Sequence, residues 1–314
     1  MPLDARAKRF LDTLAALNPP SALSLSASQR REALRHLLSF SGRTEVVGTV
    51  DDRQIPGPAG PMALRIYTPA AVPPGTALPG LVYFHGGGLV AGSLDTHDPI
   101  CRGLTNAGQC RVLSVDYRLG PEARFPAAVD DGVLAIQWVR RHALALGLDP
   151  ARIGVCGDSA GATLAAVVCQ QARGTGSHPL ALQFLLCPIM DFSVESNSRR
   201  ELANGYLVDR ETLTHDLEHY LPPGGDAADP RVSPLRCADL SGLPPTIIHT
   251  AEYDPLRDEG RTYAERLEAA GVRTLYRCHP GMIHLFYGMR ALIPYAGTAF
   301  EQMGADIRGF LAAA

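Results

Sequence analysis

The segment Gly157-Asp158-Ser159-Ala160-Gly161 places a serine between a short apolar run and a helical pattern. This context is typical of a nucleophile elbow, a tight strand-to-helix turn that exposes a serine hydroxyl. Glycines flank the serine because a Cβ at either position would collide within such a turn. A turn of small residues without chemical function is the alternative. The strand before and the helix after favour Ser159 as a nucleophile.

A second pattern, His85-Gly86-Gly87-Gly88, follows an apolar stretch that ends at Phe84. Consecutive glycines let the backbone approach a ligand closely and leave amide groups free to donate. Acyl transfer needs such donors for the oxyanion of its tetrahedral intermediate. The alternative is a glycine-rich turn without a ligand. We expect the His85 imidazole to brace this loop by hydrogen bonding and not to carry a proton.

A serine nucleophile needs a base, and the base needs an acid that orients it. With this type of elbow the chain order is serine, acid, histidine. Asp254 and His284 fit that order, and each follows a predicted strand. Glu252 and Asp258 are competing acids, although the first turn of a helix suits Asp258 as a structural carboxylate. His279 is a competing base, but it lies closer to the strand end than His284 does.

The elements that position these residues alternate along the chain. Two predicted helices, 5–17 and 28–39, come first, and two predicted strands, 44–50 and 62–67, follow them. After that, predicted strands at 81–84, 111–115, 153–156, 180–187, 246–250 and 273–278 alternate with helices at 99–107, 127–148, 160–172, 256–270 and 295–311. Such alternation predicts a mostly parallel sheet covered by helices on both faces. Residues from about 191 to 244 interrupt it, with a predicted helix at 210–221.

Composition excludes several classes of protein. The 314 residues are 46% hydrophobic and 19% charged, which is typical of a globular chain. The net charge of −3 and scattered arginines do not suggest nucleic-acid binding. No apolar run reaches the about 18 residues that span a bilayer, so we expect no stable membrane insertion. The charged N-terminus lacks the apolar region of a signal peptide, and we expect a cytoplasmic location.

Metal-binding patterns are weak. The seven cysteines are odd in number and form no CxxC pair, so we expect buried free thiols. His215-Asp216-Leu217-Glu218-His219 matches the HxxEH pattern of inverted zinc proteases, with both histidines on one helix face. No further ligand cluster lies near in sequence. A solvated helix face is the preferred interpretation, and we expect no metal.

Taken together, the motifs resemble those of the hormone-sensitive-lipase-like (bacterial family IV) esterases of the α/β-hydrolase superfamily, GDSAG type. The segments that carry the resemblance are HGGG at 85–88, DYRLGPE at 116–122, FPAA at 125–128, GDSAG at 157–161, DPLRDEG at 254–260 and GMIHLF at 281–286.

The resemblance implies an α/β-hydrolase fold with a mostly parallel eight-stranded sheet and a helical cap. Residues 1–50 would form an N-terminal cap, and residues 51–314 a catalytic domain with a cap insertion at about 191–244. Ser159 would be the nucleophile, His284 the base and Asp254 the acid. The implied oxyanion hole is made by the amides of Gly86, Gly87 and Ala160.

The implied activity is that of a serine carboxylesterase acting on small-molecule esters of short to medium acyl chains through an acyl-enzyme. No cofactor is required by this chemistry. Leu89, Tyr206, Leu207 and Leu285 are expected to line an apolar substrate pocket. An amidase, peptidase, lactonase or deacetylase could use the same triad. A catalytically silent hormone-receptor-like binding protein is another alternative, and a homodimer through the last strand and helix is possible.

Three positions depart from the pattern of this family. Gly120 stands where alanine is usual, and Ala162-Thr163 replaces the usual Gly-Asn after GDSAG. Leu285 replaces the glycine that usually follows the catalytic histidine. The side chain of Leu285 is therefore expected to alter the shape of the pocket.

Overall fold

A single eight-stranded sheet forms the centre of the molecule. The computed structural model describes residues 1–70, 72–73, 75–174 and 179–312. In that part of the chain the strand order is β1-β2-β4-β3-β5-β6-β7-β8. The strands are β1 (Thr49–Gly57), β2 (Gly60–Thr68), β3 (Leu78–Phe84), β4 (Arg111–Val115), β5 (Leu148–Asp158), β6 (Gln183–Leu186), β7 (Thr246–Tyr253) and β8 (Thr274–Ile283).

Only the first two strands run antiparallel to their neighbours. Strands β3 to β8 are mutually parallel, and β2 pairs antiparallel with both β1 and β4. The chain passes from β3 outward to β4 and then crosses to β5 on the other side of β3. Such a switch point opens a crevice at the carboxyl ends of the strands. The HGGG loop and Ser159 follow the two strands on either side of it, β3 and β5.

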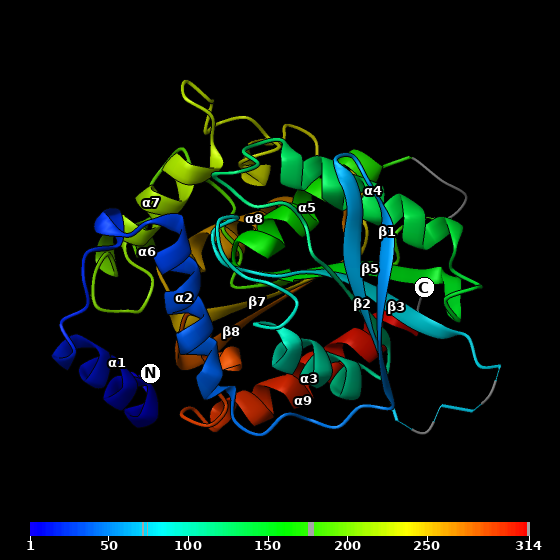
Figure 1. Cartoon of the computed structure of the whole chain (residues 1–314), viewed down its shortest axis with the longest axis horizontal. Coiled ribbons are helices and arrows are strands. Elements are labelled where there is room, and N and C mark those ends of the chain that lie inside the picture. Colours follow the sequence, from blue (N-terminus) through cyan, green and yellow to red (C-terminus); the bar gives the residue numbers. More distant parts are fainter. Residues whose placement is uncertain (71, 74, 175–178, 313–314) are drawn as a thin grey trace.

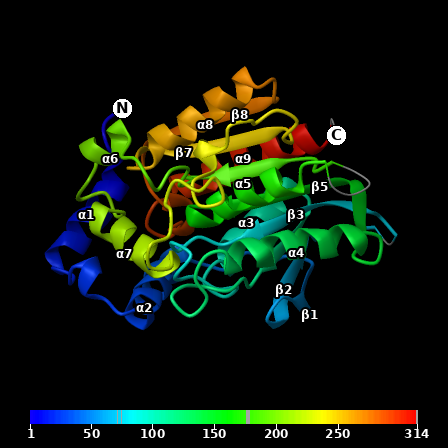
Figure 2. The ribbon, with the colours of Figure 1, turned by 90° about the horizontal axis from the view of Figure 1, so that it is seen from above.

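Helices cover both faces of the sheet (Figures 1 and 2). Within β3, Val82 packs into the core on one face, and Tyr83 packs into the core on the other, as the alternation of strand side chains requires. The first core is shared with α4 (Ala127–Arg141), α5 (Ala160–Ala172) and α8 (Arg257–Ala269). The second is shared with α3 (Asp98–Gly108) and α9 (Tyr295–Leu311). The α/β-hydrolase fold expected from the sequence is therefore confirmed.

Four further helices gather at one end of the molecule, beyond the carboxyl ends of the parallel strands (Figure 2). They are α1 (Ala5–Ala16), α2 (Ala27–Leu38), α6 (Asn197–Glu201) and α7 (Arg210–Tyr220). Helix α2 begins with a capping box in which Ser26 and Gln29 exchange hydrogen bonds. The N-cap is therefore Ser26, two residues before the expected Ser28. None of the helices described here is long and apolar enough to cross a membrane.

Several predicted boundaries were wrong. The strand predicted over 44–50 begins only at Thr49 and continues to Gly57 as β1. The helix predicted over 127–148 ends at Arg141, because the chain turns at Gly147, where φ is +62°, and enters β5 at Leu148. Strand β8 continues beyond the predicted 273–278, because after a register shift Ile283 still pairs with Tyr253 of β7. As a result His279 lies within the strand, and His284 follows its last residue directly.

Candidate active site

Ser159 occupies a strained turn between β5 and α5. Its φ of +53° and ψ of −124° lie in a region that non-glycine residues rarely adopt. A Cβ on Gly157 would lie 2.3 Å from the carbonyl oxygen of Gly161, and one on Gly161 would lie 2.1 Å from that of Phe84. The flanking residues must therefore be glycine for steric reasons. The strand, turn and helix together form the expected elbow.

A continuous chain of hydrogen bonds joins the serine to a buried carboxylate. His284 Nε2 lies 3.1 Å from Ser159 Oγ, and His284 Nδ1 lies 2.7 Å from Asp254 Oδ2. The backbone amide of Leu256 donates to the other oxygen of Asp254, at 2.9 Å. A carboxylate facing Nδ1 favours the tautomer with its proton there, so Nε2 is left to accept the serine proton. Asp254 and His284 are both buried.

The competing acids and base have other partners. Glu252 accepts the amide hydrogen of Gly281 at 2.7 Å and braces the strand that leads to His284. Asp258 lies in the first turn of α8, as its structural interpretation required. His279 Nε2 faces His249 Nδ1 at 3.0 Å, on the side of the sheet where α9 packs.

The oxyanion loop requires a correction. The Gly86 amide already donates to Asp158 Oδ1 at 2.8 Å, so the prediction that it binds the oxyanion was wrong. Gly87 and Gly88, with φ of +118° and +70°, line the cavity beside the serine instead. Among the described residues neither of their amides donates a hydrogen bond within the protein. Ala160 is the first residue of α5, where the amide has no intrahelical partner.

Asp158 fixes this loop to the elbow, a function that the sequence analysis missed. Its buried carboxylate accepts hydrogen bonds from Tyr83 Oη at 2.5 Å and Tyr287 Oη at 3.4 Å, and His97 Nε2 lies 3.5 Å away. Burial alone would raise the pKa of Asp158, but the charge of His97 and the hydrogen bonds hold it below its usual value. Asp158 is therefore ionised, and it accepts the one hydrogen bond that the Gly86 amide can donate. The sign of this function in the sequence is the acidic residue before the serine in the GDSAG motif.

His85 braces the loop as expected. Its ring stacks on Tyr117 with 4.4 Å between centroids, and its Nδ1 lies 2.9 Å from the carbonyl oxygen of Gly86. Burial lowers the pKa of His85 to about 3, so the ring is neutral near pH 7.

A cavity of about 380 Å³ adjoins Ser159 and His284. Of the four expected lining residues, Leu207 and Leu285 border it, and Leu89 and Tyr206 do not. Leu89 is 2% exposed and packs into the core beneath the loop. Tyr206 instead stacks on Tyr253, with 5.7 Å between ring centroids.

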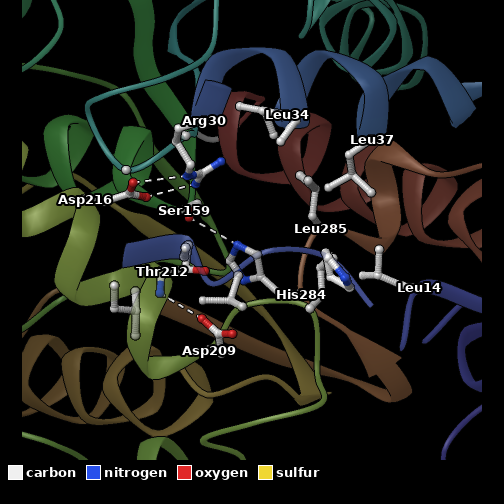
Figure 3. A pocket seen from close by; sticks show the side chains of 18 of the residues that line it. Leu14, Arg30, Leu34, Leu37, Ser159, Asp209, Thr212, Asp216, His284 and Leu285 are labelled. Atoms are coloured by element: carbon white, nitrogen blue, oxygen red, sulfur yellow. Dashed lines mark hydrogen bonds and ion pairs between the residues drawn. The ribbon is translucent and has the colours of Figure 1, made fainter. Parts of the chain in front are cut away.

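The cavity has an apolar wall and a polar corner (Figure 3). Most of the apolar side chains come from the N-terminal helices, which the sequence analysis had not connected with the pocket. They include Leu11, Leu14, Leu34 and Leu37, and Leu285 faces them. The polar corner contains Arg30, Asp209, Thr212 and Asp216.

One group in the described part of the chain has the composition of a metal site. Ligand atoms of Cys187, Asp254 and His284 lie within 4.8 Å of one another. Burial and the neighbouring Asp254 carboxylate raise the pKa of the Cys187 thiol well above its usual value, which keeps it protonated and a poor ligand. In the HxxEH segment the expectation of a solvated helix face was wrong for His215 and Asp216, which are both buried. The His215 and His219 rings stack at 4.1 Å, and each ring has a nitrogen facing a backbone carbonyl.

Comparison with known proteins places the chain among ester hydrolases. Residues 81–288 match the sequence profile of a family described as the alpha/beta hydrolase fold. Carboxylesterase NlhH of Mycobacterium tuberculosis is 44% identical over 240 residues, which cover 75% of this chain and 74% of that protein. An arylesterase of Saccharolobus solfataricus is 37% identical over 290 residues, 92% of this chain and 93% of that protein. The structure of ester hydrolase EH1AB1 from the metagenome of Lake Arreo has a TM-score of 0.95 at 39% identity and covers 99% of both chains.

Proposed function

The chain belongs to the α/β-hydrolase fold family and is a carboxylic ester hydrolase, and from that premise we propose that Ser159, His284 and Asp254 carry out the hydrolysis. The observation that carries this proposal is the unbroken chain of hydrogen bonds from Asp254 through His284 to the serine hydroxyl. It joins a partly exposed nucleophile to a buried base and a buried orienting acid.

In the first step His284 Nε2 takes the proton of Ser159 as Oγ attacks the ester carbonyl carbon. The carbonyl oxygen becomes an oxyanion, and the amides of Gly87, Gly88 and Ala160 donate to it. One such donor contributes about 3 kcal/mol to transition-state stabilisation. Asp254 stabilises the imidazolium through Nδ1. The intermediate then collapses, and the alcohol leaves with the proton of His284.

In the second step water cleaves the acyl-enzyme by the same route. His284 removes a proton from the water as its oxygen attacks the acyl carbon. The second oxyanion occupies the same three amides. Collapse breaks the bond to Ser159 Oγ, which regains its proton from His284, and the carboxylic acid is released.

We propose short to medium acyl chains as substrates. The cavity of about 380 Å³ is enclosed on one side by leucines of α1 and α2, including Leu14, Leu34 and Leu37. This apolar wall favours an aliphatic or aromatic group over a charged one. The limited volume favours soluble esters over long lipids.

The test is to measure hydrolysis of p-nitrophenyl esters from acetate to palmitate by the wild type and by Ser159→Ala. We expect a maximum at short chains and loss of at least a thousandfold in the variant. Amide and lactone substrates are assayed in parallel. Comparable rates on an amide would favour the amidase alternative, and activity that survives Ser159→Ala would refute the assignment of the nucleophile.

We also propose the domain division, the compartment and the assembly. Residues 1–50 and about 191–244 would form one cap over a catalytic domain, since both supply residues to the same cavity.

The odd number of cysteines supports a reducing cytoplasm. Strand β8 ends the sheet and offers an edge for a homodimer. Sedimentation equilibrium at several protein concentrations would distinguish this dimer from a monomer.

A further inference from the structure

The polar corner of the cavity contains a buried ion pair. Arg30 of α2 donates to Asp216 of α7 through two parallel contacts, Nε to Oδ1 at 3.1 Å and Nη2 to Oδ2 at 2.9 Å. The side chains are 14% and 5% exposed. Placing two charges beside an apolar wall costs desolvation energy that their attraction offsets only partly. The pair is therefore poorly explained by stability alone.

The pair is held beside the oxyanion loop. A Cβ on Gly88 would lie 1.9 Å from Asp216 Oδ2, so the carboxylate packs directly on this glycine. His215 Nδ1 lies 3.1 Å from Asp216 Oδ1, and His215 Nε2 faces the carbonyl oxygen of Leu25 at 2.9 Å. Asp216 is thus fixed from two sides, which in turn fixes the guanidinium of Arg30.

One edge of that guanidinium remains available. Arginine carries five N–H donors, and the contacts with Asp216 use only Nε and Nη2. Within the described chain, Arg30 Nη1 has no hydrogen-bond partner. Arg30 and Ser159 line the same cavity, so a substrate bound at Ser159 lies within the cavity that the fixed guanidinium also borders (Figure 3).

We propose that Arg30 is a specificity-determining residue that binds a second, neutral oxygen of the substrate. The substrate class is esters that carry an ether, keto or hydroxyl oxygen in addition to the scissile ester. A neutral oxygen fits better than a carboxylate, because Asp216 already neutralises Arg30 and Asp209 adds another acidic side chain to the cavity. This proposal rests on the proposed esterase function and narrows its substrates.

The test compares two esters of equal chain length, p-nitrophenyl pentanoate and p-nitrophenyl 3-methoxypropanoate, in which an ether oxygen replaces one methylene. The quantity measured is the ratio of kcat/KM for the ether ester to kcat/KM for the aliphatic ester. The variant is Arg30→Met/Asp216→Asn, because replacing both partners leaves neither buried charge without its counter-ion. We expect its ratio to be about tenfold lower than that of wild type. A tenfold change corresponds to the loss of one charge-assisted hydrogen bond. Arg35→Met, on the same helix but exposed and outside the cavity, should keep the wild-type ratio.

An unchanged ratio in the double variant would overturn the proposal, and so would an equal fall in Arg35→Met. Because the ratio cancels general losses of activity, a partly impaired variant still gives a result. Arg30→Met alone serves as a second variant if the double variant does not fold. Failure of the esterase function itself would look different, since neither ester would then be hydrolysed, or hydrolysis would survive Ser159→Ala.

Discussion

At the scale of single residues, Leu285 has a backbone conformation that favours glycine. Its φ is +59° and its ψ is 14°, and its side chain borders the cavity directly after His284. A non-glycine residue in this left-handed region costs about 1 kcal/mol. The leucine carries that cost in a position where its side chain borders the cavity, and we propose that it acts in substrate selection.

Leu285→Gly should therefore widen the acyl-chain preference. We expect the rate on p-nitrophenyl decanoate relative to butyrate to rise severalfold, because the side chain that fills the cavity is removed and glycine adopts the same φ freely. Steady-state kcat/KM values for the two esters give the measurement. Leu285→Met keeps the bulk and should keep the wild-type preference, and a widened preference in this control would refute the steric explanation.

Chain order and motif context were enough to select Ser159, Asp254 and His284, whose side chains the structure brings together. The error at Gly86 has a physical reason: its amide is used by the Asp158 side chain, a contact 72 positions away in sequence that no local pattern reveals. The lining of the pocket could not be predicted for the same reason, since it also depends on contacts between distant parts of the chain. Leu14 and Leu34 lie more than a hundred positions from the serine, and only the tertiary structure brings them to it.

At the scale of elements, the elbow depends on close packing of backbone against backbone. Gly161, in the first turn of α5, lies against the carbonyl groups that end β3. Gly120 has a comparable function, since a Cβ there would lie 2.5 Å from the carbonyl oxygen of His219, near the end of α7. The glycine that departs from the usual alanine thus lets the end of helix α7 approach the loop that contains Gly120. Element types were predicted from periodicity, whereas the strand extension that places His284 depended on pairing between β7 and β8.

Gly161→Ala should prevent this packing. The new Cβ would lie 2.1 Å from the Phe84 oxygen and 2.4 Å from the His85 oxygen, and neither backbone group can yield alone. We expect the free energy of unfolding to fall by about 3 kcal/mol or more, measured by urea denaturation. Gly309→Ala is the matched control, because its Cβ meets nothing within 4 Å in helix α9, and it should stabilise by up to about 1 kcal/mol. Equal effects at both positions would contradict the packing argument.

At the scale of the whole molecule, two cores enclose the sheet, and buried histidines couple its stability to pH. Burial, with the nearby His249 as a second cause, lowers the pKa of His279 from 6.5 to about 3. The unfolded chain therefore binds a proton at this residue between pH 6.5 and 3 that the folded chain does not. The contribution of His279 to the free energy of unfolding is therefore present above about pH 6.5 and is lost as the pH falls through that window.

His279→Gln should remove part of this acid sensitivity. Between pH 7 and pH 5 the His279 contribution to the free energy of unfolding falls by roughly 2 kcal/mol, so the variant should lose less stability than wild type by about that amount. Urea denaturation at both pH values gives the comparison. His36→Gln, an exposed histidine on α2, should leave the pH dependence as it is in wild type. Parallel losses in wild type and His279→Gln would exclude this source of acid sensitivity.

The central claim is that Ser159 is the residue acylated during turnover, and covalent labelling tests it most directly. The protein is treated with diethyl p-nitrophenyl phosphate, and the adduct is located by peptide mass spectrometry while p-nitrophenol release is followed. We predict one diethylphosphoryl group per chain, on Ser159, with loss of esterase activity in step with labelling. Labelling of another residue in step with inactivation, or full labelling of Ser159 with activity retained, would contradict the account.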